Sequence, residues 1–230
     1  LRDWWEDVFS AMARPGHRYC YTDVLTGNLS MPQALLEKAG GFDQSFTCRE
    51  DYELGVRLLH AGAELFFCPE ARSWHEDRTD YRKIMQRKKD EGKADVMMAR
   101  KHPEVRGTLH ISRQFSSLLW PSRLLRAVTR ISPEAADRLV ALLAPGLALC
   151  ESLRIRSLWR VLLGGMLVHF YWRGVLAEAK GWDEVRRLAD ALDAVEAVRG
   201  ALIASGGRIT DSLFDELGTG WAARWPGIVA

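Results

Sequence analysis

The chain has 230 residues, 47% of them hydrophobic and 27% charged, which fits a globular protein and excludes disorder as its default state. The net charge of +2 hides an uneven distribution, because residues 1–60 carry a net charge of −3 and residues 100–160 a net charge of +7. We therefore expect the two regions to meet different partners.

The first hundred residues mix the patterns of helices and strands. Apolar residues at helical spacing predict a helix over Leu1–Ala13, and the β-rich stretch Tyr19–Met31 predicts one or two strands. The other elements expected in this part are helices over Gln33–Ala39, Arg49–His60 and Thr79–Lys101 and a strand over Glu64–Cys68. Because two or three strands do not form a stable sheet by themselves, we expect them to be the edge of a larger sheet whose other strands lie outside this chain.

The strand signals fade after residue 103. The expected elements are helices over Ser122–Ile131, Pro133–Ala144, Ser157–Ala179, Trp182–Val198 and Asp211–Leu217. The uncharged runs Leu139–Cys150 and Val161–Trp172 are each about a dozen residues, whereas a spanning helix needs roughly 20, so no transmembrane helix is predicted. The four cysteines have neither zinc nor disulfide-framework spacing and are expected to be reduced thiols.

An ordered set of short motifs runs through the first hundred residues. It comprises Thr26-Gly27-Asn28-Leu29-Ser30-Met31, Gly40-Gly41-Phe42-Asp43, Glu50-Asp51-Tyr52-Glu53-Leu54-Gly55, Pro69-Glu70-Ala71 and His75, then Gly92 and Lys101-His102-Pro103. This order and spacing resembles the acceptor half of family-two (GT-A type) glycosyltransferases, and Phe170-Tyr171-Trp172-Arg173-Gly174 resembles the tail of bacterial members. The resemblance covers residues 1 to 103.

The resemblance implies a fold and a division into domains. The fold would be α/β, a partial GT-A fold that lacks its N-terminal donor-binding half and is followed by a mostly α-helical region. The domains would be an acceptor-side half at 1–103, a basic amphipathic region at 104–180 and a helical tail at 181–230. The Asp-x-Asp metal motif is absent from the chain. The chain alone is therefore expected to be inactive, and we expect it to begin inside a longer protein.

The resemblance also assigns chemistry. The reaction would transfer a sugar from a nucleotide-sugar donor to a hydroxyl acceptor with inversion, in cell-surface polysaccharide or glycolipid synthesis. Asp51 would be the general base and Glu50 a positioning group, because a carboxylate in hydrogen-bond reach can take the proton of the attacking hydroxyl. Gly27, Asn28 and Arg49 would bind substrate. Mg²⁺ or Mn²⁺ would neutralise the departing diphosphate, with His75 as a ligand.

Each of these residues has a structural alternative. Carboxylates such as Glu50 and Asp51 are favoured at a helix N-terminus by the helix dipole alone. Asn28 can be a turn residue, Arg49 an exposed arginine, and His75 a buried neighbour of Trp74.

The basic region resembles a helix that lies in a membrane interface. Arg123, Arg126 and Arg130 share one helical face, and Arg154, Arg156 and Arg160 alternate with aliphatic and aromatic residues. We expect an anionic membrane surface as a partner, with the protein cytoplasmic and peripheral on the inner face of the cell membrane. An ordinary helical subdomain is the alternative, and no nucleic-acid-binding signature is present. The rival function is a non-catalytic helical membrane adaptor that retains a vestigial transferase half.

Overall fold

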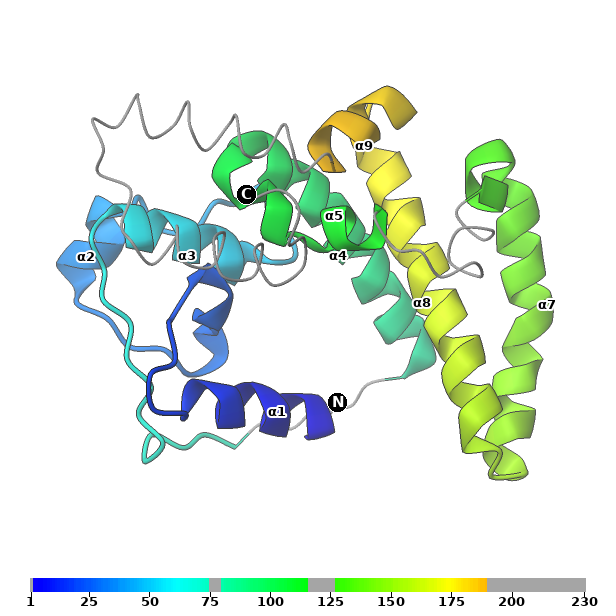
Figure 1. The fold of residues 1–230 in the computed structure, drawn as a ribbon, viewed down its shortest axis with the longest axis horizontal. Coiled ribbons are helices and arrows are strands. Elements are labelled where there is room, and N and C mark those ends of the chain that lie inside the picture. The colour runs from blue at the N-terminus through cyan, green and yellow to red at the C-terminus, as the bar shows by residue number, and fades with distance from the viewer. Residues whose placement is uncertain (1, 75–79, 116–126, 190–230) are drawn as a thin grey trace, which may run out of the picture. The chain divides into compact units, whose positions relative to one another are not determined.

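The computed structural model describes residues 2–74, 80–115 and 127–189 of the chain (Figure 1). The described residues up to 74 belong to one compact unit, and those from 80 onward belong to a second. The division into domains at residues 103 and 180 stays a prediction.

The first unit contains three α-helices and two short 3₁₀ turns among its described residues. They are α1 (Arg2–Met12), η1 (Tyr21–Asp23), η2 (Thr26–Asn28), α2 (Gln33–Lys38) and α3 (Glu50–His60). Val24, Leu54 and Leu58 form the centre of its core, and side chains from α2 and from residues 63–65 pack around them. The helices predicted over Leu1–Ala13, Gln33–Ala39 and Arg49–His60 are therefore confirmed.

Gly55 lets η1 lie directly on α3. A Cβ atom placed on Gly55 would come within 2.6 Å of the Tyr21 backbone oxygen and 3.0 Å of the Val24 side chain. No real Cβ packs at the first distance, so this contact requires glycine. The rings of Tyr21 and Tyr52 meet edge to face beside it, with 6.0 Å between their centroids.

The α/β fold class predicted from the sequence is wrong, since none of the residues that the structure describes forms a strand and the regular elements are all helical. In the Tyr19–Met31 stretch, the Asp23 carboxylate accepts the backbone N–H of Cys20 at 2.9 Å, which favours a 3₁₀ turn over an extended strand. The stretch predicted as the strand Glu64–Cys68 has no strand beside it among residues 2–74, 80–115 and 127–189. Its Phe67 backbone N–H donates to the Tyr19 hydroxyl at 3.1 Å. Strand propensity without a pairing partner does not make a sheet.

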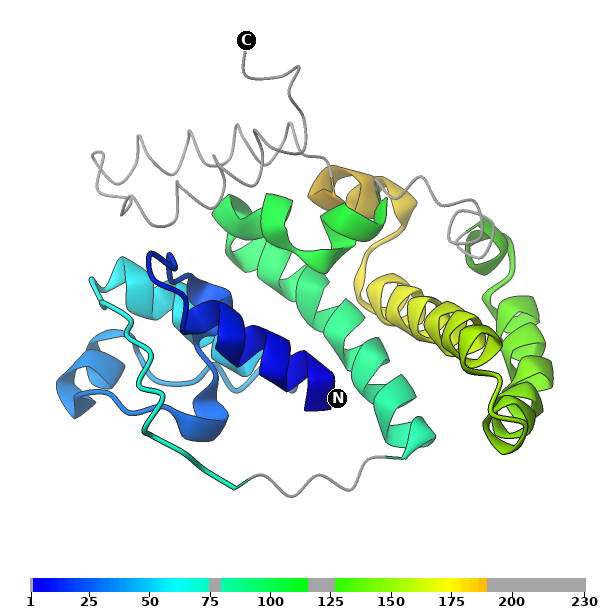
Figure 2. The same ribbon diagram turned by 60° about the horizontal axis from the view of Figure 1, so that its bottom comes forward.

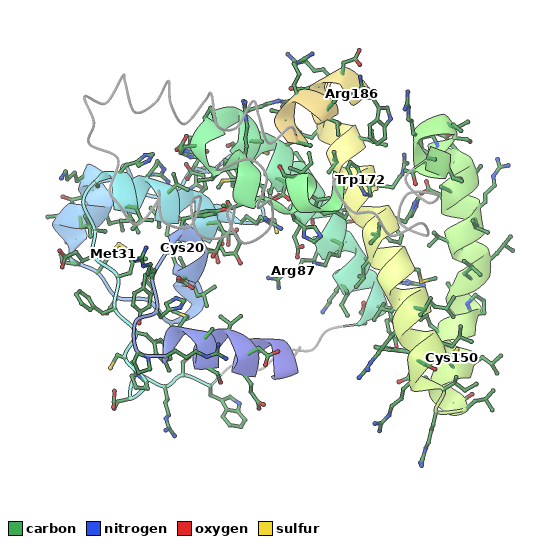
Figure 3. The ribbon with its side chains drawn as sticks, viewed as in Figure 1. Cys20, Met31, Arg87, Cys150, Trp172 and Arg186 are labelled. Carbon is green, nitrogen blue, oxygen red and sulfur yellow. The ribbon has the colours of Figure 1, made fainter. Side chains whose placement is uncertain are left out.

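The second unit is a set of packed helices. Its described elements are α4 (Tyr81–Lys101), η3 (Pro103–Thr108), α5 (His110–Phe115), a helical stretch at 127–131, α7 (Pro133–Ser152), α8 (Arg156–Glu178) and α9 (Trp182–Ala189). α8 lies between α4 and α7 (Figures 1 and 2). Trp172 of α8 stacks on Trp182 at the start of α9, with 5.6 Å between ring centroids (Figure 3).

Two glycines set the crossing of α4 and α8. A Cβ on Gly92 would overlap the Tyr171 backbone oxygen, and a Cβ on Gly174 would overlap the Lys89 backbone oxygen. The two helix backbones therefore touch at this crossing. The Tyr171 hydroxyl donates to the buried Asp95 carboxylate from the same side of α8.

Charged contacts fix the far end of this crossing. The Arg100 guanidinium donates to the carboxylates of Glu178 at 2.7 Å and Glu184 at 2.8 Å. Hydrogen bonding from Arg100 lowers the pKa of Glu184 to about 2, and the same contact raises the pKa of Arg100. This network joins α4 to the end of α8 and to α9.

The helices of the second unit agree largely with the sequence pattern. Thr79–Lys101 and Ser157–Ala179 match α4 and α8 within two residues. α7 runs on through Pro145 to Ser152, so the predicted end at Ala144 is wrong. The structure describes only parts of the helices predicted over Ser122–Ile131 and Trp182–Val198, and those parts are helical. The predicted helix Asp211–Leu217 and the residues Arg123 and Arg126 lie outside the described residues.

Two further findings concern the described residues as a whole. None of their helices is both long enough and apolar enough to cross a bilayer. No disulfide joins Cys20, Cys48, Cys68 and Cys150, all four of which the structure describes.

Candidate functional site

The predicted catalytic carboxylates occupy the first turn of α3. Glu50 and Asp51 are its first two residues, and both are partly buried. The Asp51 Oδ1 atom accepts the backbone N–H of Tyr52 at 2.8 Å. This hydrogen bond holds the carboxylate at the helix N-terminus, where the helix dipole favours its charged form. Asp51 thus presents a partly exposed carboxylate at the start of α3, and a carboxylate within hydrogen-bond reach of an acceptor hydroxyl can act as a general base.

Arg49 precedes the two carboxylates in an unusual backbone conformation. Its φ angle is +58°, in the left-handed region, and it and Arg154 are the described non-glycine residues with positive φ. A branched or long side chain in this region costs about 1 kcal/mol or more. The Arg49 guanidinium lies over the Tyr52 ring, with 5.6 Å between its central carbon and the ring centroid. Strain of this kind is concentrated at functional sites.

Glu53 has a structural role that the sequence pattern did not reveal. Its side chain is fully buried, and both oxygens accept hydrogen bonds from Arg57, the shortest at 2.6 Å. Arg57 also donates to the backbone oxygen of Ala39 at the end of α2. The pair ties α2 to α3, so Glu53 cannot act with Asp51 as a substitute for an Asp-x-Asp metal motif. The spacing of four residues within a helix was the available signal.

The Gly27–Asn28 turn is the second part of the predicted site. Gly27 is exposed, and a Cβ atom added to it would meet nothing within 4 Å. Its missing side chain is therefore not required by packing within the protein, which leaves room for a ligand against the backbone. The Asn28 side-chain amide donates to the Ala71 backbone oxygen at 2.8 Å. This bond ties the turn to the segment that leads to His75, and His75 itself lies outside the described residues.

The two parts of the site are joined through η1. Tyr21 packs on α3 at Gly55, and Val24, one residue after η1, is buried between Leu54 and Leu58. η2 begins two residues after Val24. The turn that carries Gly27 and Asn28 is thus anchored to the helix that carries Asp51 by the core of the first unit.

The described residues do not supply a metal site. They contain no group of three or more His, Cys, Asp or Glu side chains arranged to hold an ion. Within the first turn of α3, Glu53 is occupied by Arg57, so only Glu50 and Asp51 remain there as candidate ligands. The described residues alone therefore do not fit Mg²⁺ or Mn²⁺.

Comparison with known proteins finds a partial similarity. A stretch of this chain is similar to a glycosyltransferase. Over 77 residues it is 36% identical to the pre-mycofactocin glycosyltransferases of two strains of Mycobacterium tuberculosis, CDC 1551 / Oshkosh and ATCC 25618 / H37Rv. The match takes in 34% of this chain and 16% of each relative. No family model matches the chain. No solved structure matches it significantly.

Proposed function

We propose that this chain carries the acceptor-activating part of a family-two glycosyltransferase that works as a longer protein. The observation that carries the proposal is the partly exposed Asp51 carboxylate, held at the first turn of α3 by the Tyr52 backbone N–H. The partial similarity to a glycosyltransferase supports it. The donor would be a nucleotide-sugar, and the acceptor a saccharide or lipid-linked hydroxyl.

In the proposed reaction, the acceptor hydroxyl oxygen attacks the anomeric carbon of the donor. The hydroxyl proton passes to the Asp51 carboxylate as the new C–O bond forms. The bond from the anomeric carbon to the diphosphate oxygen breaks, and the nucleoside diphosphate leaves with the electron pair. Direct attack from the opposite face inverts the anomeric configuration.

Arg49 and the Gly27 turn would position the substrates. The Arg49 guanidinium, which lies over the Tyr52 ring, can pair through its N–H groups with a phosphate or a sugar hydroxyl. The exposed Gly27 backbone would lie against the donor sugar or the acceptor, and Glu50 would orient the groups around Asp51. A bound Mg²⁺ or Mn²⁺ would have to be held by residues outside the described part of the chain, His75 among them.

The test uses the complete protein from which this chain comes. Binding of UDP, GDP and dTDP is measured by calorimetry with Mn²⁺ and with EDTA, because the nucleoside diphosphate is common to all donors whatever their sugar. Donors of the bound nucleotide are then supplied with saccharide, glycolipid and pre-mycofactocin acceptors. We expect nucleotide binding and acceptor-dependent release of the diphosphate, with an inverted product by NMR. A complete protein that binds none of the nucleotides contradicts the proposal.

A second candidate function is a non-catalytic helical adaptor. It is favoured by one observation, the all-helical architecture of the described residues, which differs from the α/β architecture expected of a transferase. The same calorimetry distinguishes the two candidates, because an adaptor has no need to bind a nucleoside diphosphate.

A further inference from the structure

One face of α7 exposes aliphatic side chains to solvent. Residues 139–150 contain no charged or hydrogen-bonding polar side chain apart from the thiol of Cys150. A helix that is apolar on all sides is normally buried on all sides. Here Val140, Leu147 and Cys150 are buried, whereas Leu142 is 78% exposed and Leu149 is 59% exposed. Leu139 and Leu143 are also exposed, and all four exposed leucines share one helical face by their spacing.

The apolar surface continues around the turn that joins α7 to α8. Leu153, Ile155, Leu158 and Val161 are exposed there, with Leu153 at 59% and Val161 at 70%. We call these four residues together with Leu139, Leu142, Leu143 and Leu149 the hairpin surface. Apolar surface this continuous is rare on a soluble monomer and marks an interaction site.

Three arginines surround the turn. Arg154, Arg156 and Arg160 are all exposed. The nearest acidic residue in the sequence is Glu151, whose carboxylate accepts the Tyr81 hydroxyl at 2.9 Å. The turn is therefore positively charged beside its exposed aliphatic residues. Cys150 marks this end of α7 in Figure 3.

Arg154 occupies a position where glycine would be more stable. α7 ends with the backbone N–H of Ile155 donating to the Cys150 oxygen at 2.9 Å and that of Arg154 donating to the Glu151 oxygen at 3.1 Å. This is the Schellman pattern, whose left-handed residue is usually glycine. Arg154 takes that role with a φ of +56°. The chain thus keeps a cation at the tip of the hairpin at a cost in folding stability.

We propose that the hairpin surface inserts into the interface of an anionic lipid bilayer. The hairpin surface consists only of leucine, isoleucine and valine, and it contains no aromatic or hydrogen-bonding side chain. Such an aliphatic surface suits contact with acyl chains, whereas protein interfaces are enriched in aromatic residues and methionine. The arginines complement anionic headgroups and can extend toward them from partly inserted helix stems.

The dimensions agree with insertion into one leaflet. The uncharged stretch 139–150 is about 18 Å long as a helix, against a hydrocarbon core of about 30 Å. Interfacial helices bury their apolar face about 5–10 Å deep. The hairpin would hold the second unit on a membrane surface, such as the inner face of the cell membrane. This inference does not depend on the proposed transfer chemistry.

The experiment is vesicle sedimentation of the full chain. Vesicles of phosphatidylcholine alone and of phosphatidylcholine with phosphatidylglycerol at 3:1 are compared at low and high salt. We expect binding to the mixed vesicles at low salt and much weaker binding to the neutral ones. Failure to bind the mixed vesicles at low salt overturns the proposal.

Matched variants separate the two parts of the surface. The double variant Arg156→Gln, Arg160→Gln should weaken vesicle binding about 30-fold. Its control is the double variant Arg186→Gln, Arg187→Gln, which removes the same charge from α9 at the opposite end of the unit and should change binding little (Figure 3). The double variant Leu142→Ser, Leu149→Ser should weaken vesicle binding by about tenfold or more. Its control is Ile131→Ser, which changes an exposed apolar residue outside the hairpin surface and should leave binding unchanged.

Two results would count against lipid insertion even if the chain sediments with vesicles. If the leucine variants bind as the unchanged chain does, binding is purely electrostatic and the surface does not insert. If light scattering shows a dimer that the Leu142→Ser, Leu149→Ser variant abolishes, the surface is an interface between two copies of the chain. Arg154→Gly gives an independent readout, because it should raise thermal stability while weakening vesicle binding.

Discussion

Gly92 of α4 and Gly174 of α8 lie at one helix crossing, where each helix backbone contacts the backbone oxygens of the other. Both glycines belong to short motifs that resemble parts of a glycosyltransferase sequence. The structure gives these motifs a packing role, since the first permits the approach of Tyr171 and the second the approach of Lys89. The motifs at 92–103 and 170–174 therefore meet in one structural feature of the second unit.

Replacing either glycine should destabilise the second unit. Gly174→Ala places a methyl group into the Lys89 carbonyl, so the helices must separate, and we expect a loss of about 2–3 kcal/mol in the free energy of unfolding. Urea unfolding followed by circular dichroism measures the loss, and hydrogen exchange of the α4 and α8 amides locates it. Gly164→Ala and Gly165→Ala in the same helix are the controls, because a Cβ there meets nothing and alanine favours helix. Equal stabilisation by all three changes would show that the crossing is not tight.

The buried pair Glu53–Arg57 should be necessary to the first unit. Arg57→Met leaves the Glu53 carboxylate buried without its guanidinium partner, and we expect a loss of about 3–5 kcal/mol in the free energy of unfolding. The double variant Glu53→Met, Arg57→Met removes both charges and should lose less than the single one. A double variant less stable than Arg57→Met would mean that the loss of the pair itself, and not the buried carboxylate left without Arg57, dominates.

His169 should make stability depend on pH. It is fully buried and hydrogen-bonded to Asp137 at 2.7 Å and Thr129 at 3.3 Å. Burial lowers its pKa below 6.5, against the opposing effect of Asp137, and the nearby Arg173 lowers it further. Below pH 6.5 the His169 side chain binds a proton in the unfolded chain but not in the folded chain. The free energy of unfolding should therefore be highest above pH 6.5 and should fall as the pH drops toward the folded-state pKa of His169.

Melting temperatures between pH 8 and pH 5 measure this dependence. His169→Gln, which keeps a side chain able to hydrogen-bond, should flatten the curve below pH 6.5. An unchanged slope in this variant would assign the pH dependence to another group.

Arg49→Gly should separate stability from activity. Glycine relieves the left-handed backbone strain at φ +58°, so we expect the chain to gain about 1 kcal/mol in the free energy of unfolding. In the complete protein the same change should lower kcat/KM for transfer about tenfold to a hundredfold, because a charged hydrogen bond to substrate is lost. Arg49→Lys keeps both the strain and the charge, and should be intermediate in activity. Full activity in the glycine variant would remove Arg49 from the site.

The helices of this protein were predictable because their signals are local. The charged stretch Tyr81–Lys101 ends before Pro103, and α7 starts at Pro133, so both signals lie within a few turns of the element they define. The strands were predicted wrongly because pairing is not local. Tyr19–Met31 has the composition of a strand, but the Asp23 carboxylate and the packing of Tyr21 on Gly55 favour turns instead.

The place of Asp51 in the fold was predictable from the sequence, but the surroundings of the predicted site residues were not. The order of motifs placed Asp51 at the start of a helix, where the structure also has it. The spacing of four residues allows Glu53 to pair with Arg57, but it does not show that Glu53 is buried. The hydrogen bond from Asn28 to Ala71, 43 positions away, follows from a three-dimensional contact that spacing in the sequence does not encode. The left-handed backbone conformation of Arg49 could not be predicted either, because a non-glycine residue with a positive φ angle is uncommon.

The central claim is that the Asp51 carboxylate takes the proton of the acceptor hydroxyl. Its most direct test is the single-turnover rate of sugar transfer in the complete protein, with Asp51→Asn at saturating donor and acceptor. Asparagine retains an oxygen to accept the Tyr52 N–H but cannot take the proton, so we predict a rate about 10²–10⁴-fold lower with donor binding unchanged. Asp43→Asn, the same change in a loop where the carboxylate contacts Ser45, should stay near the unchanged rate. An Asp51→Asn protein that transfers sugar at the unchanged rate would contradict the claim.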